Sequence, residues 1–498
     1  MNTIQNIYQT NLALLTDLYQ LTMSYGYWKL GKADEQAVFH LFFRKPPFAS
    51  GYTISAGLGY VVDFLSNFQI TDDDVTYLGT LQGNDGKPLF IREYLNYLRE
   101  MTFTCDIDAI PEGTVVFPNE PLVRVTGPII QCQILESLLL NIINFQTLIA
   151  TKSARICQAA GDDPVLEFGL RRAQGIDGAL AASRAAYIGG AAATSNVLAG
   201  KLLGIPVKGT HAHSWVMSFD TEMQAFDGYA DAMPNNCVFL VDTYDTLDGV
   251  RHAIEVGQKL RKNGHKMVGI RLDSGDLTYL SIEARKLLDE AGFNDAAIVA
   301  SNDLDETIIE NLKQQGATIN VWGVGTRLVT AHEQPALGGV YKLGAIRQAK
   351  NDTWQPRIKV SEQAIKTSIP GIQQVRRYKT EKGLLGDMIF DEATLGAPDS
   401  NHATSMIDPA DVTRMKIVPA ECDFEDLLIP VFRQGKCVYD KPNLADIRQR
   451  TQSQLAMLHP TIRRFMNPHE YPVGLEPRLH GMRTDMAFKA RGVTLSKR

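Results

Sequence analysis

Six short apolar runs between residues 165 and 322 each end in a cluster of side chains that could do chemistry. The clusters contain Arg171, Arg172, Lys208, His213, Asp242, Arg271, Asp273, Asp276, Asp303 and the turn Gly323-Val324-Gly325-Thr326. Arginine grips a carboxylate or phosphate through paired hydrogen bonds, and a glycine-rich turn before a helix offers N–H groups to a phosphate. Aspartates can hold Mg²⁺, ribose hydroxyls or a developing positive charge. Together these groups predict a site for a phosphorylated, metal-bound sugar.

Each feature also has an ordinary structural explanation. An aspartate at a strand end is often a helix cap, the glycine-rich turn is often only a turn, and Arg171-Arg172 is often a solvated salt-bridging pair. Convergence of the clusters favours a phosphate-handling enzyme but names no substrate. The chain contains no Walker-type phosphate loop, no complete G-x-G-x-x-G after a strand, no serine nucleophile elbow and no H-E-x-x-H zinc helix.

The elements that must position these residues follow a regular alternation. The apolar runs lie at 165–168, 205–207, 238–241, 267–270, 298–300 and 319–322, with helical patterns at 249–262, 277–290 and 304–315. This alternation predicts successive βα units around a parallel sheet, closed or nearly closed into a barrel. Because chemistry in such barrels sits at the carboxyl ends of the strands, we expect the clusters to share one mouth.

Composition narrows the class of protein. A net charge of -6 argues against a dedicated binder of nucleic acid or anionic membrane. The six cysteines are dispersed without a C-x-x-C pair, which favours a reduced intracellular protein. The first ten residues lack a signal-peptide pattern, and polar side chains interrupt the apolar stretch 129–145 as in a buried helix. We therefore expect a cytoplasmic protein with no nucleic-acid or membrane partner.

Longer strings carry a resemblance to a known family. They are TDLYQLTM (16–23), FFRKPPF (42–48), EFGLRRAQG (167–175), KGTHAHSW (208–215), IRLDSGDL (270–277), SNDLDE (301–306), GVGTRLVT (323–330) and LGGVYKL (337–343). From about residue 10 to about residue 420, in the same order, they resemble the nicotinate phosphoribosyltransferase family. These motifs are long and specific, so the chain is identified as a member of that family.

The resemblance implies a fold and an assembly. The fold would be α/β, with an irregular (β/α) barrel of the type II phosphoribosyltransferase kind at residues 141–344. Residues 1–140 together with 345–420 would form an α+β sandwich domain, and residues 421–498 a C-terminal extension. The family also implies a homodimer in which the partner's N-terminal region completes each active site.

The resemblance implies a nicotinate site as well. Tyr19, contributed by the other subunit, would stack on the pyridine ring, and Phe168 would cover the opposite face. Arg171 and Arg271 would grip the nicotinate, with Thr210 adding a hydrogen bond. Two arginines make physical sense because nicotinate is an anion whose nitrogen must be directed at the sugar.

A second group would bind phosphoribosyl pyrophosphate, again by resemblance. It comprises Arg44, Asp303, Gly323, Gly325, Thr326, Lys342, Lys359 and Thr367. Arg44 would reach across the dimer, and the two glycines with Thr326 would form the phosphate turn. Asp273 and Asp303 would serve the ribose and its Mg²⁺, with Asp273 acting in catalysis. The individual Mg²⁺ ligands stay open.

His213 resembles the histidine that ATP phosphorylates in this family, coupling ATP hydrolysis to product formation. An imidazole can accept a phosphoryl group as a nucleophile, although an isolated histidine is more often a core residue. His211 stands where an apolar residue is common in the family, so a second imidazole competes with His213 or assists it. We expect His213 to be the phosphorylated residue.

The implied activity is ATP-dependent synthesis of nicotinate mononucleotide and pyrophosphate from nicotinate and phosphoribosyl pyrophosphate, within NAD salvage. Relatives that use nicotinamide carry an aspartate where this chain has Ser195, and a neutral serine does not repel the substrate carboxylate. A quinolinate-specific relative would need more cations and is usually shorter. The alternatives are a nicotinamide phosphoribosyltransferase and a catalytically silent barrel that senses NAD precursors.

Overall fold

The computed structural model describes residues 11–348, 352–363, 366–381 and 383–493, and it divides the chain into two compact units. The sandwich unit contains residues up to 147, residues 337–442 and residues from 453 onward. The barrel unit contains residues 148–336 and 443–452. The last stretch, expected as an extension from residue 421, is thus divided between the two units instead of forming one of its own.

The barrel unit is built on a six-stranded parallel sheet. Its order is β7-β6-β11-β10-β9-β8, with β6 Val165–Glu167, β7 Ala193–Thr194, β8 Val238–Leu240, β9 Gly269–Leu272, β10 Ala297–Ala300 and β11 Val321–Val324. Helices α12 (Thr246–Lys262), α13 (Leu277–Glu290) and α14 (Glu306–Gln314) alternate with the later strands. Five of the six predicted runs overlap strands of this sheet, so the predicted βα alternation is confirmed. The run at 205–207 is not a strand and contributes only a bridge at Val207, and β7 was not predicted.

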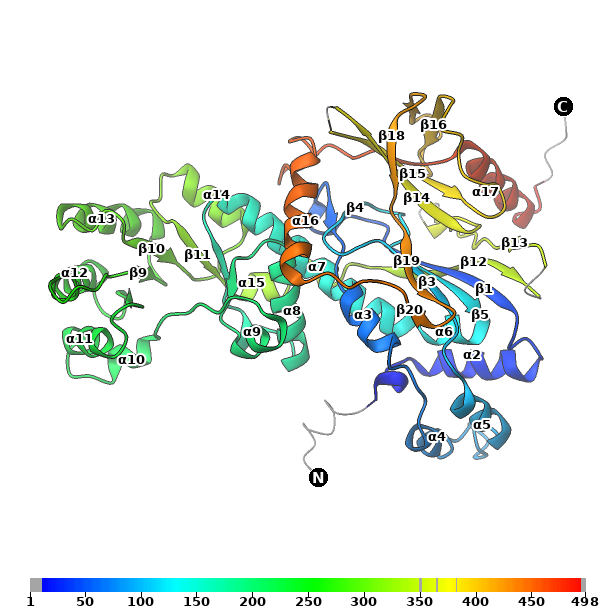
Figure 1. Cartoon of the computed structure of the whole chain (residues 1–498), viewed down its shortest axis with the longest axis horizontal. Coiled ribbons are helices and arrows are strands. Elements are labelled where there is room, and N and C mark those ends of the chain that lie inside the picture. The colour runs from blue at the N-terminus through cyan, green and yellow to red at the C-terminus, as the bar shows by residue number, and fades with distance from the viewer. Residues whose placement is uncertain (1–10, 349–351, 364–365, 382, 494–498) are drawn as a thin grey trace. The chain divides into compact units, whose positions relative to one another are not determined.

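Further helices surround this sheet. They are α8 (Ile176–Ile188), α9 (Val197–Leu203), α10 (His213–Met217), α11 (Glu222–Ala232) and the short α15 (Thr326–Val329). In Figure 1, α11, α12 and α13 lie in a row beside β9 and β10. Their buried positions, such as Val250, Ala253 and Leu288, pack the outer face of the sheet and account for the apolar side of each helical pattern.

The sheet of the barrel unit keeps two edges. β7 and β8 are the outermost strands, and a parallel bridge from Thr194 to Val207 adds one more residue beside β7. Residues 208–212 then run from this bridge to α10 without forming helix or strand. The barrel is therefore irregular and open, with a seam between Val207 and β8 within the described residues.

Aspartates cap the helices that follow three of the strands. Asp245 accepts a hydrogen bond from the N–H of Asp248 at 2.9 Å, and Asp276 accepts from Tyr279 at 3.0 Å. Asp305 accepts from Ile308 at 2.9 Å in the same way. Asp276, one of the candidate strand-end residues, is thus a helix cap, which was the structural explanation considered for it.

Two larger sheets form the sandwich unit. The seven-stranded sheet, in the order β13-β12-β1-β5-β3-β19-β20, comprises β1 Gln36–Phe42, β3 Asp106–Ala109, β5 Val123–Pro128, β12 Val340–Arg347, β13 Gln355–Pro356, β19 Ile429–Arg433 and β20 Lys436–Cys437. The six-stranded sheet, in the order β17-β16-β21-β15-β14-β18, comprises β14 Gln373–Thr380, β15 Gly383–Asp391, β16 Thr404–Ile407, β17 Met415–Val418, β18 Asp423–Asp426 and β21 Val473–Leu475. Late strands extend both sheets: β19 pairs with β3, and β21 lies between β15 and β16.

Short elements complete the sandwich unit. The strands β2 (Thr53–Ile54) and β4 (Val115–Val116) form a small third sheet. The helices are α2 Leu18–Lys29, α3 Leu58–Leu65, α4 Asp72–Leu78, α5 Arg92–Glu100, α6 Ile129–Ile134 and α17 Pro477–Ala490, while α7 (Glu136–Ala160) and α16 (Leu444–Met457) carry residues of both units. None of the helices among the described residues combines the length and the apolar character needed to cross a membrane.

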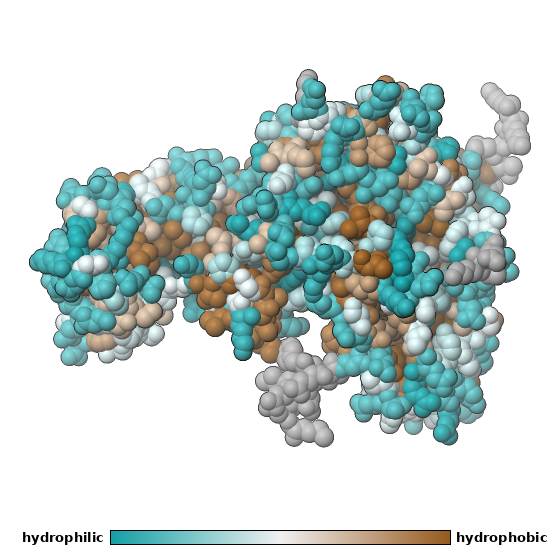
Figure 2. Space-filling view, in the orientation of Figure 1, coloured by the Kyte–Doolittle hydropathy of each residue, from teal (hydrophilic) through white to brown (hydrophobic). Residues whose placement is uncertain are grey.

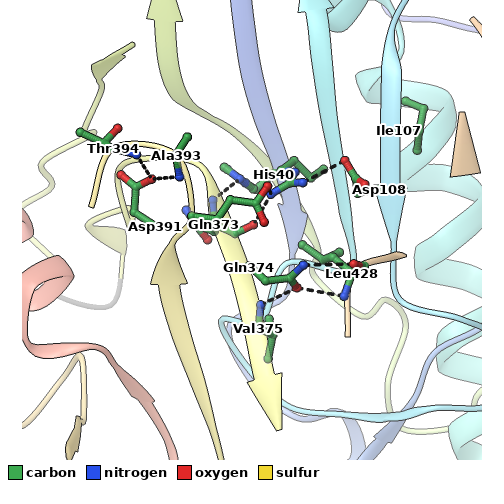
Figure 3. Close-up of polar contacts among 12 residues, drawn as sticks. His40, Ile107, Asp108, Gln373, Gln374, Val375, Asp391, Ala393, Thr394 and Leu428 are labelled. Atoms are coloured by element: carbon green, nitrogen blue, oxygen red, sulfur yellow. Dashed lines mark hydrogen bonds and ion pairs between the residues drawn. The ribbon is translucent and has the colours of Figure 1, made fainter. Parts of the chain in front are cut away.

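A buried polar junction ties the start of β14 to the seven-stranded sheet (Figure 3). The N–H of Gln373 donates to Nε2 of His40 at 3.1 Å, and Arg124 donates to the carbonyl of Gln373 at 3.1 Å. Arg124 is held in turn by Asp108 at 2.9 Å and by Glu392 at 2.8 Å. Burial and the charge of Arg124 keep the pKa of His40 well below its usual value, so His40 is a neutral acceptor.

A second buried network lies around Arg377. Its guanidinium pairs with Asp387 at 2.5 Å, and both side chains are fully buried. The Tyr471 hydroxyl donates to the same carboxylate at 2.8 Å. Nearby, Glu120 accepts from the N–H of Phe117 at 2.9 Å, and burial together with the charge of Asp387 raises its pKa well above the usual range. The rise in the pKa of Glu120 reflects the cost of placing a second negative charge in a buried site beside Asp387, which the nearby Arg377 offsets in part.

Candidate active site

The barrel unit brings His213 and Asp242 together. Asp242 follows β8 with a fully buried side chain, and His213 is the first residue of α10. Nε2 of His213 lies 3.2 Å from one Asp242 oxygen. The other oxygen accepts from the N–H of Asp273 at 2.9 Å and from the Ser274 hydroxyl at 2.6 Å. The carboxylate thus fixes the imidazole with Nε2 turned toward it, and Nδ1 has no partner among the described residues.

Arg271 is the centre of a polar network at the end of β9. Its guanidinium donates to the hydroxyls of Ser301 at 2.7 Å and Thr210 at 2.9 Å, and to the Asp273 carboxylate at 2.8 Å. Ser301 also contacts Asp273 directly. The structure therefore brings Thr210, Arg271 and Asp273 together. It also balances the charge of Arg271 with Asp273, so this arginine is not a free cation.

Phe168 lies beside this network. The Arg271 guanidinium carbon is 5.8 Å from the centre of the Phe168 ring. Gly323 of β11 leaves room for that ring, because a Cβ built on Gly323 would lie only 2.7 Å from its edge. The buried Glu167, at the end of β6, accepts hydrogen bonds from the Ser183 hydroxyl of α8 at 2.9 Å and from the N–H of Gly169, which fixes the turn after Phe168. Gly323 therefore leaves the space that the Phe168 ring occupies. The sequence predicted only a phosphate-binding turn at Gly323 and not this role.

Arg171 supplies a free cation on the same side of the sheet. It lies on the 3-10 turn Leu170–Arg172, directly after Phe168, and is exposed. Within the described parts of the chain no hydrogen bond or ion pair engages its guanidinium. Since Arg271 is neutralised by Asp273, Arg171 is the arginine of the expected pair whose charge remains available to an anion.

The remaining candidates of the barrel unit sit on the turns after β10 and β11. Asp303 is exposed, and its N–H donates to the Asn302 side chain at 2.9 Å. Asn302 itself has a φ of 119°, which side-chain-bearing residues rarely adopt. Gly325 precedes the single turn of α15, which begins at Thr326. Across the described residues, no group of three or more His, Cys, Asp or Glu side chains is arranged to hold a metal ion.

The sandwich unit holds the other candidates. Tyr19, Lys342 and Lys359 line one cavity of about 530 Å³. Burial lowers the pKa of Lys342, and the nearby charges of Lys359 and Arg44 lower it further, while Glu136 acts in the opposite direction. These three cations therefore share one positive region, as phosphate binding requires.

Thr367 is tied to this region through its neighbour Ser368. The Ser368 hydroxyl accepts from the N–H of Lys359 at 2.8 Å, and the Ser368 N–H donates to the Lys359 carbonyl at 3.0 Å. Two charged residues that line the cavity, Glu136 and Arg357, were not among the predicted site residues. Arg357 could have been found from its place two residues before Lys359, because alternate residues of an extended segment face the same way.

A parallel sheet of βα units in one unit and a mainly antiparallel sandwich in the other define a type II phosphoribosyltransferase fold. The solved structure of human nicotinic acid phosphoribosyltransferase superposes with a TM-score of 0.82 at 33% identity, covering 95% of this chain and 99% of that one. The nicotinate-nucleotide pyrophosphorylase of Pyrococcus furiosus shares the fold, with a TM-score of 0.65 at 21% identity and coverage of 90% and 96%.

Sequence comparison specifies the family within that fold. Residues 14–144, 165–382 and 373–483 match the nicotinate phosphoribosyltransferase (NAPRTase) N-terminal domain, family and C-terminal domain profiles. The Bacillus subtilis nicotinate phosphoribosyltransferase is 45% identical, over 93% of both chains. The human enzyme is 36% identical, over 94% of this chain and 95% of its own. The chain belongs to the nicotinate phosphoribosyltransferase family and is an enzyme of that type, as its motifs predicted.

Proposed function

We propose that this enzyme joins nicotinate to phosphoribosyl pyrophosphate, and that it couples the reaction to ATP hydrolysis through a phosphohistidine at His213. The products are nicotinate mononucleotide and pyrophosphate, a step of NAD salvage. The observation that carries the coupling is the pairing of His213 Nε2 with the buried Asp242 carboxylate at 3.2 Å. This pairing leaves Nδ1 as the free nucleophilic nitrogen of the ring.

The nicotinate subsite would use the residues around Phe168. Its ring offers an apolar face to the pyridine, and the free Arg171 offers a cation to the carboxylate. Arg271, oriented by its hydrogen bond to the Thr210 hydroxyl, adds a donor at the same place, and Thr210 adds a hydroxyl that could hydrogen-bond the substrate. Tyr19, which is 49% exposed on α2, would supply the second ring from another subunit. This combination suits an aromatic acid held with its nitrogen toward the sugar.

Phosphoribosyl transfer needs charge stabilisation more than proton transfer. The pyridine nitrogen forms a bond to the anomeric carbon while the bond from that carbon to pyrophosphate breaks, and no general base is required. Lys342, Lys359 and Arg44 would stabilise the departing pyrophosphate, with Thr367 and the turn at Gly323, Gly325 and Thr326 also contacting phosphate. Asp273 and Asp303 would face the cationic sugar.

Mg²⁺ would be held by Asp303 or Asp273 together with substrate phosphate oxygens. Mg²⁺ commonly uses one or two carboxylates plus substrate phosphates, which is the kind of ligand set that either aspartate would offer. When bound, it supplies positive charge to the pyrophosphate. The exposed Asp303 is the better placed of the two, because Asp273 is already paired with Arg271.

The coupling step is a phosphoryl transfer. Nδ1 of His213 attacks the γ-phosphorus of ATP, the bond to the bridging oxygen breaks, and ADP leaves. Asp242 accepts the Nε2–H of the ring and stabilises its positive charge during the attack. After phosphoribosyl transfer, water attacks the phosphorus and releases inorganic phosphate, which restores the imidazole.

A homodimer with shared active sites is part of the proposal. Figure 2 shows apolar surface gathered over the α8 and α9 region of the barrel unit, where Ile176, Val197, Leu198 and Leu202 are exposed. The start of the sandwich unit exposes Leu12, Leu15, Leu18, Tyr19 and Met23. Contiguous apolar surface of this kind typically marks an interface.

Six unpaired cysteines support the expected reducing, cytoplasmic location.

Nicotinate is favoured over nicotinamide by the neutral Ser195. Its N–H donates to the carbonyl of Glu167 at 2.9 Å, which places it beside the strand that leads to Phe168. A hydroxyl there leaves a substrate carboxylate unopposed, whereas an aspartate would repel it. The unpaired Arg171 acts in the same direction.

The test is pyrophosphate release with phosphoribosyl pyrophosphate and Mg²⁺, comparing nicotinate with nicotinamide, each with and without ATP. We expect release with nicotinate and a clear increase with ATP, together with phosphorylation of His213. His213→Ala is expected to lose the ATP effect. Turnover with nicotinamide alone would contradict the role given to Ser195, and binding without turnover would identify a sensor.

A further inference from the structure

His211 occupies the seam of the open barrel. The chain leaves the bridge between Thr194 and Val207 on one side and reaches α10 on the other, beside the free edge of β8. A strand edge exposes backbone N–H groups that need partners, and a missing neighbouring strand cannot provide them.

The N–H of Leu240, in β8, is such a group. On the inner side β8 pairs with β9, and the following Val241 donates its N–H to the Arg271 carbonyl at 3.2 Å. The N–H of Leu240 points the other way and donates to Nε2 of His211 at 3.2 Å. A side-chain nitrogen therefore takes the place that a backbone carbonyl would hold in a closed barrel.

The surroundings of His211 fix its protonation state. The ring is only 8% exposed and meets the edge of the Tyr229 ring at 4.9 Å between centres, with Phe226 at 6.2 Å. Because Nε2 accepts a hydrogen bond, the proton must be on Nδ1, which lies 3.4 Å from the Ala212 carbonyl. Burial also lowers the pKa of the ring. His211 is thus a neutral, buried acceptor, unsuited to receive a phosphoryl group itself.

Three side chains of this short segment are held by two neighbouring strands and the turn that follows one of them. Arg271, within β9, donates to the Thr210 hydroxyl at 2.9 Å, and His213 faces Asp242, which follows β8, at 3.2 Å. Between them, His211 is bound to the backbone of β8 itself. We propose that His211 is a positioning residue, which closes the barrel seam through its contact with Leu240 and thereby holds His213 on Asp242. This inference rests on the proposed phosphorylation of His213.

The experiment compares two variants in the full-length protein. His211→Phe keeps a ring against Tyr229 but removes the acceptor, whereas His211→Gln places an amide oxygen at the same number of bonds from Cβ as Nε2. We measure transfer of labelled γ-phosphate from ATP with Mg²⁺ present. For His211→Phe we expect a phosphorylation rate at least tenfold below wild type with KM for ATP within twofold, because the buried ring does not reach the nucleotide. His211→Gln should recover most of the rate.

Other results would overturn the inference. Wild-type phosphorylation in His211→Phe would show that the acceptor is not needed, and equal loss in both variants would show that the imidazole itself is needed. If His211→Phe does not fold, ¹⁵N-histidine NMR of the wild type decides: the inference requires the proton on Nδ1, and a proton on Nε2 contradicts it. His213→Ala separates the two proposals. If ATP stimulated this variant as much as wild type, the proposed phosphorylation of His213 would itself be wrong.

Discussion

The buried carboxylate of Asp242 faces Nε2 of His213 at 3.2 Å, and its second oxygen binds the N–H of Asp273 at 2.9 Å. One side chain therefore fixes both the orientation of the imidazole and the turn that carries Asp273. The ring nitrogen that remains free is Nδ1. This relationship makes Asp242, which was only one of many strand-end candidates in the sequence, the residue on which the proposed coupling depends.

Asp242→Asn is expected to abolish efficient phosphorylation of His213. If the amide oxygen keeps the hydrogen bonds from Asp273 and Ser274, the NH₂ group faces Nε2 of His213 and forces the ring proton onto Nδ1. A wrong tautomer of this kind costs about 10³- to 10⁴-fold in rate. Labelled-phosphate transfer from ATP measures the effect. The matched control is Asp295→Asn, an exposed aspartate paired with Lys266 in the same unit, and equal phosphorylation in both variants would refute the orienting role.

Asp242 and Asp276 show how far sequence reasoning reached. Both follow a strand, and the sequence predicted that position for each. In the structure Asp276 caps α13 through the N–H of Tyr279, whereas Asp242 turns toward His213. The difference lies in side-chain direction, which the order of residue types does not encode. The βα alternation was predictable because apolar periodicity is local.

Contacts between distant segments required either the structure or the family resemblance. His40 of β1 pairs with Lys342 of β12 in antiparallel register, although about 300 residues separate them. The apolar patterns of β1 and β12 do not specify which strand each pairs with. Only the family resemblance therefore assigned Lys342 and Arg44 to the same predicted phosphoribosyl pyrophosphate site. Likewise the sequence could not show that Arg271 is neutralised by Asp273, or that late strands join both sheets of the sandwich unit.

Lys342→Ala is expected to weaken substrate binding without weakening the fold. Burial and the charges of Lys359 and Arg44 already disfavour its charged form, so removal of the amine relieves repulsion. We expect KM for phosphoribosyl pyrophosphate to rise about tenfold or more, equivalent to at least about 1.4 kcal/mol. Thermal stability should be unchanged or higher. Lys416→Ala, an exposed lysine on β17, is the control, and a similar KM change there would point to a general surface effect.

Gly323→Ala is expected to displace Phe168. A Cβ at this position would lie 2.7 Å from the edge of the ring, so the ring must shift and its contact with Arg271 must change. We expect KM for nicotinate to rise by about tenfold and the free energy of unfolding to fall by about 1–3 kcal/mol from overpacking. Gly481→Ala in α17 has open space around the new Cβ and is expected to be neutral or stabilising. An unchanged KM for nicotinate would show that Phe168 is not part of the nicotinate subsite.

Glu120→Gln is expected to change how stability depends on pH. Burial and the charge of Asp387 raise the pKa of Glu120 in the folded state. The contribution of Glu120 to stability is therefore fully present below its unfolded pKa of about 4.3 and is lost as pH rises toward the folded pKa. Glutamine never ionises, so the stability of the variant relative to wild type should grow with pH, by up to about 1.4 kcal/mol per unit in that window. Urea unfolding between pH 4 and 8 measures the free energy of unfolding of both proteins. Glu100→Gln, at an exposed position, is the control. A difference in stability between Glu120→Gln and wild type that did not change with pH would mean that Glu120 is charged in the folded protein.

Leu198→Asp tests the proposed dimer. Leu198 is 50% exposed on α9, within the apolar surface that also contains Val197 and Leu202. A charge buried at an interface core costs several kcal/mol, so we expect the particle to change from two chains to one in sedimentation velocity. Because Tyr19 of another subunit is proposed to complete the nicotinate subsite, turnover should fall together with the dimer and recover partly at high protein concentration. Ile417→Asp places the same charge on an exposed apolar position of β17 and should leave both mass and activity unchanged. A monomeric Leu198→Asp variant with full activity would show that each chain carries a complete site, and Tyr19 would then have to act within its own subunit.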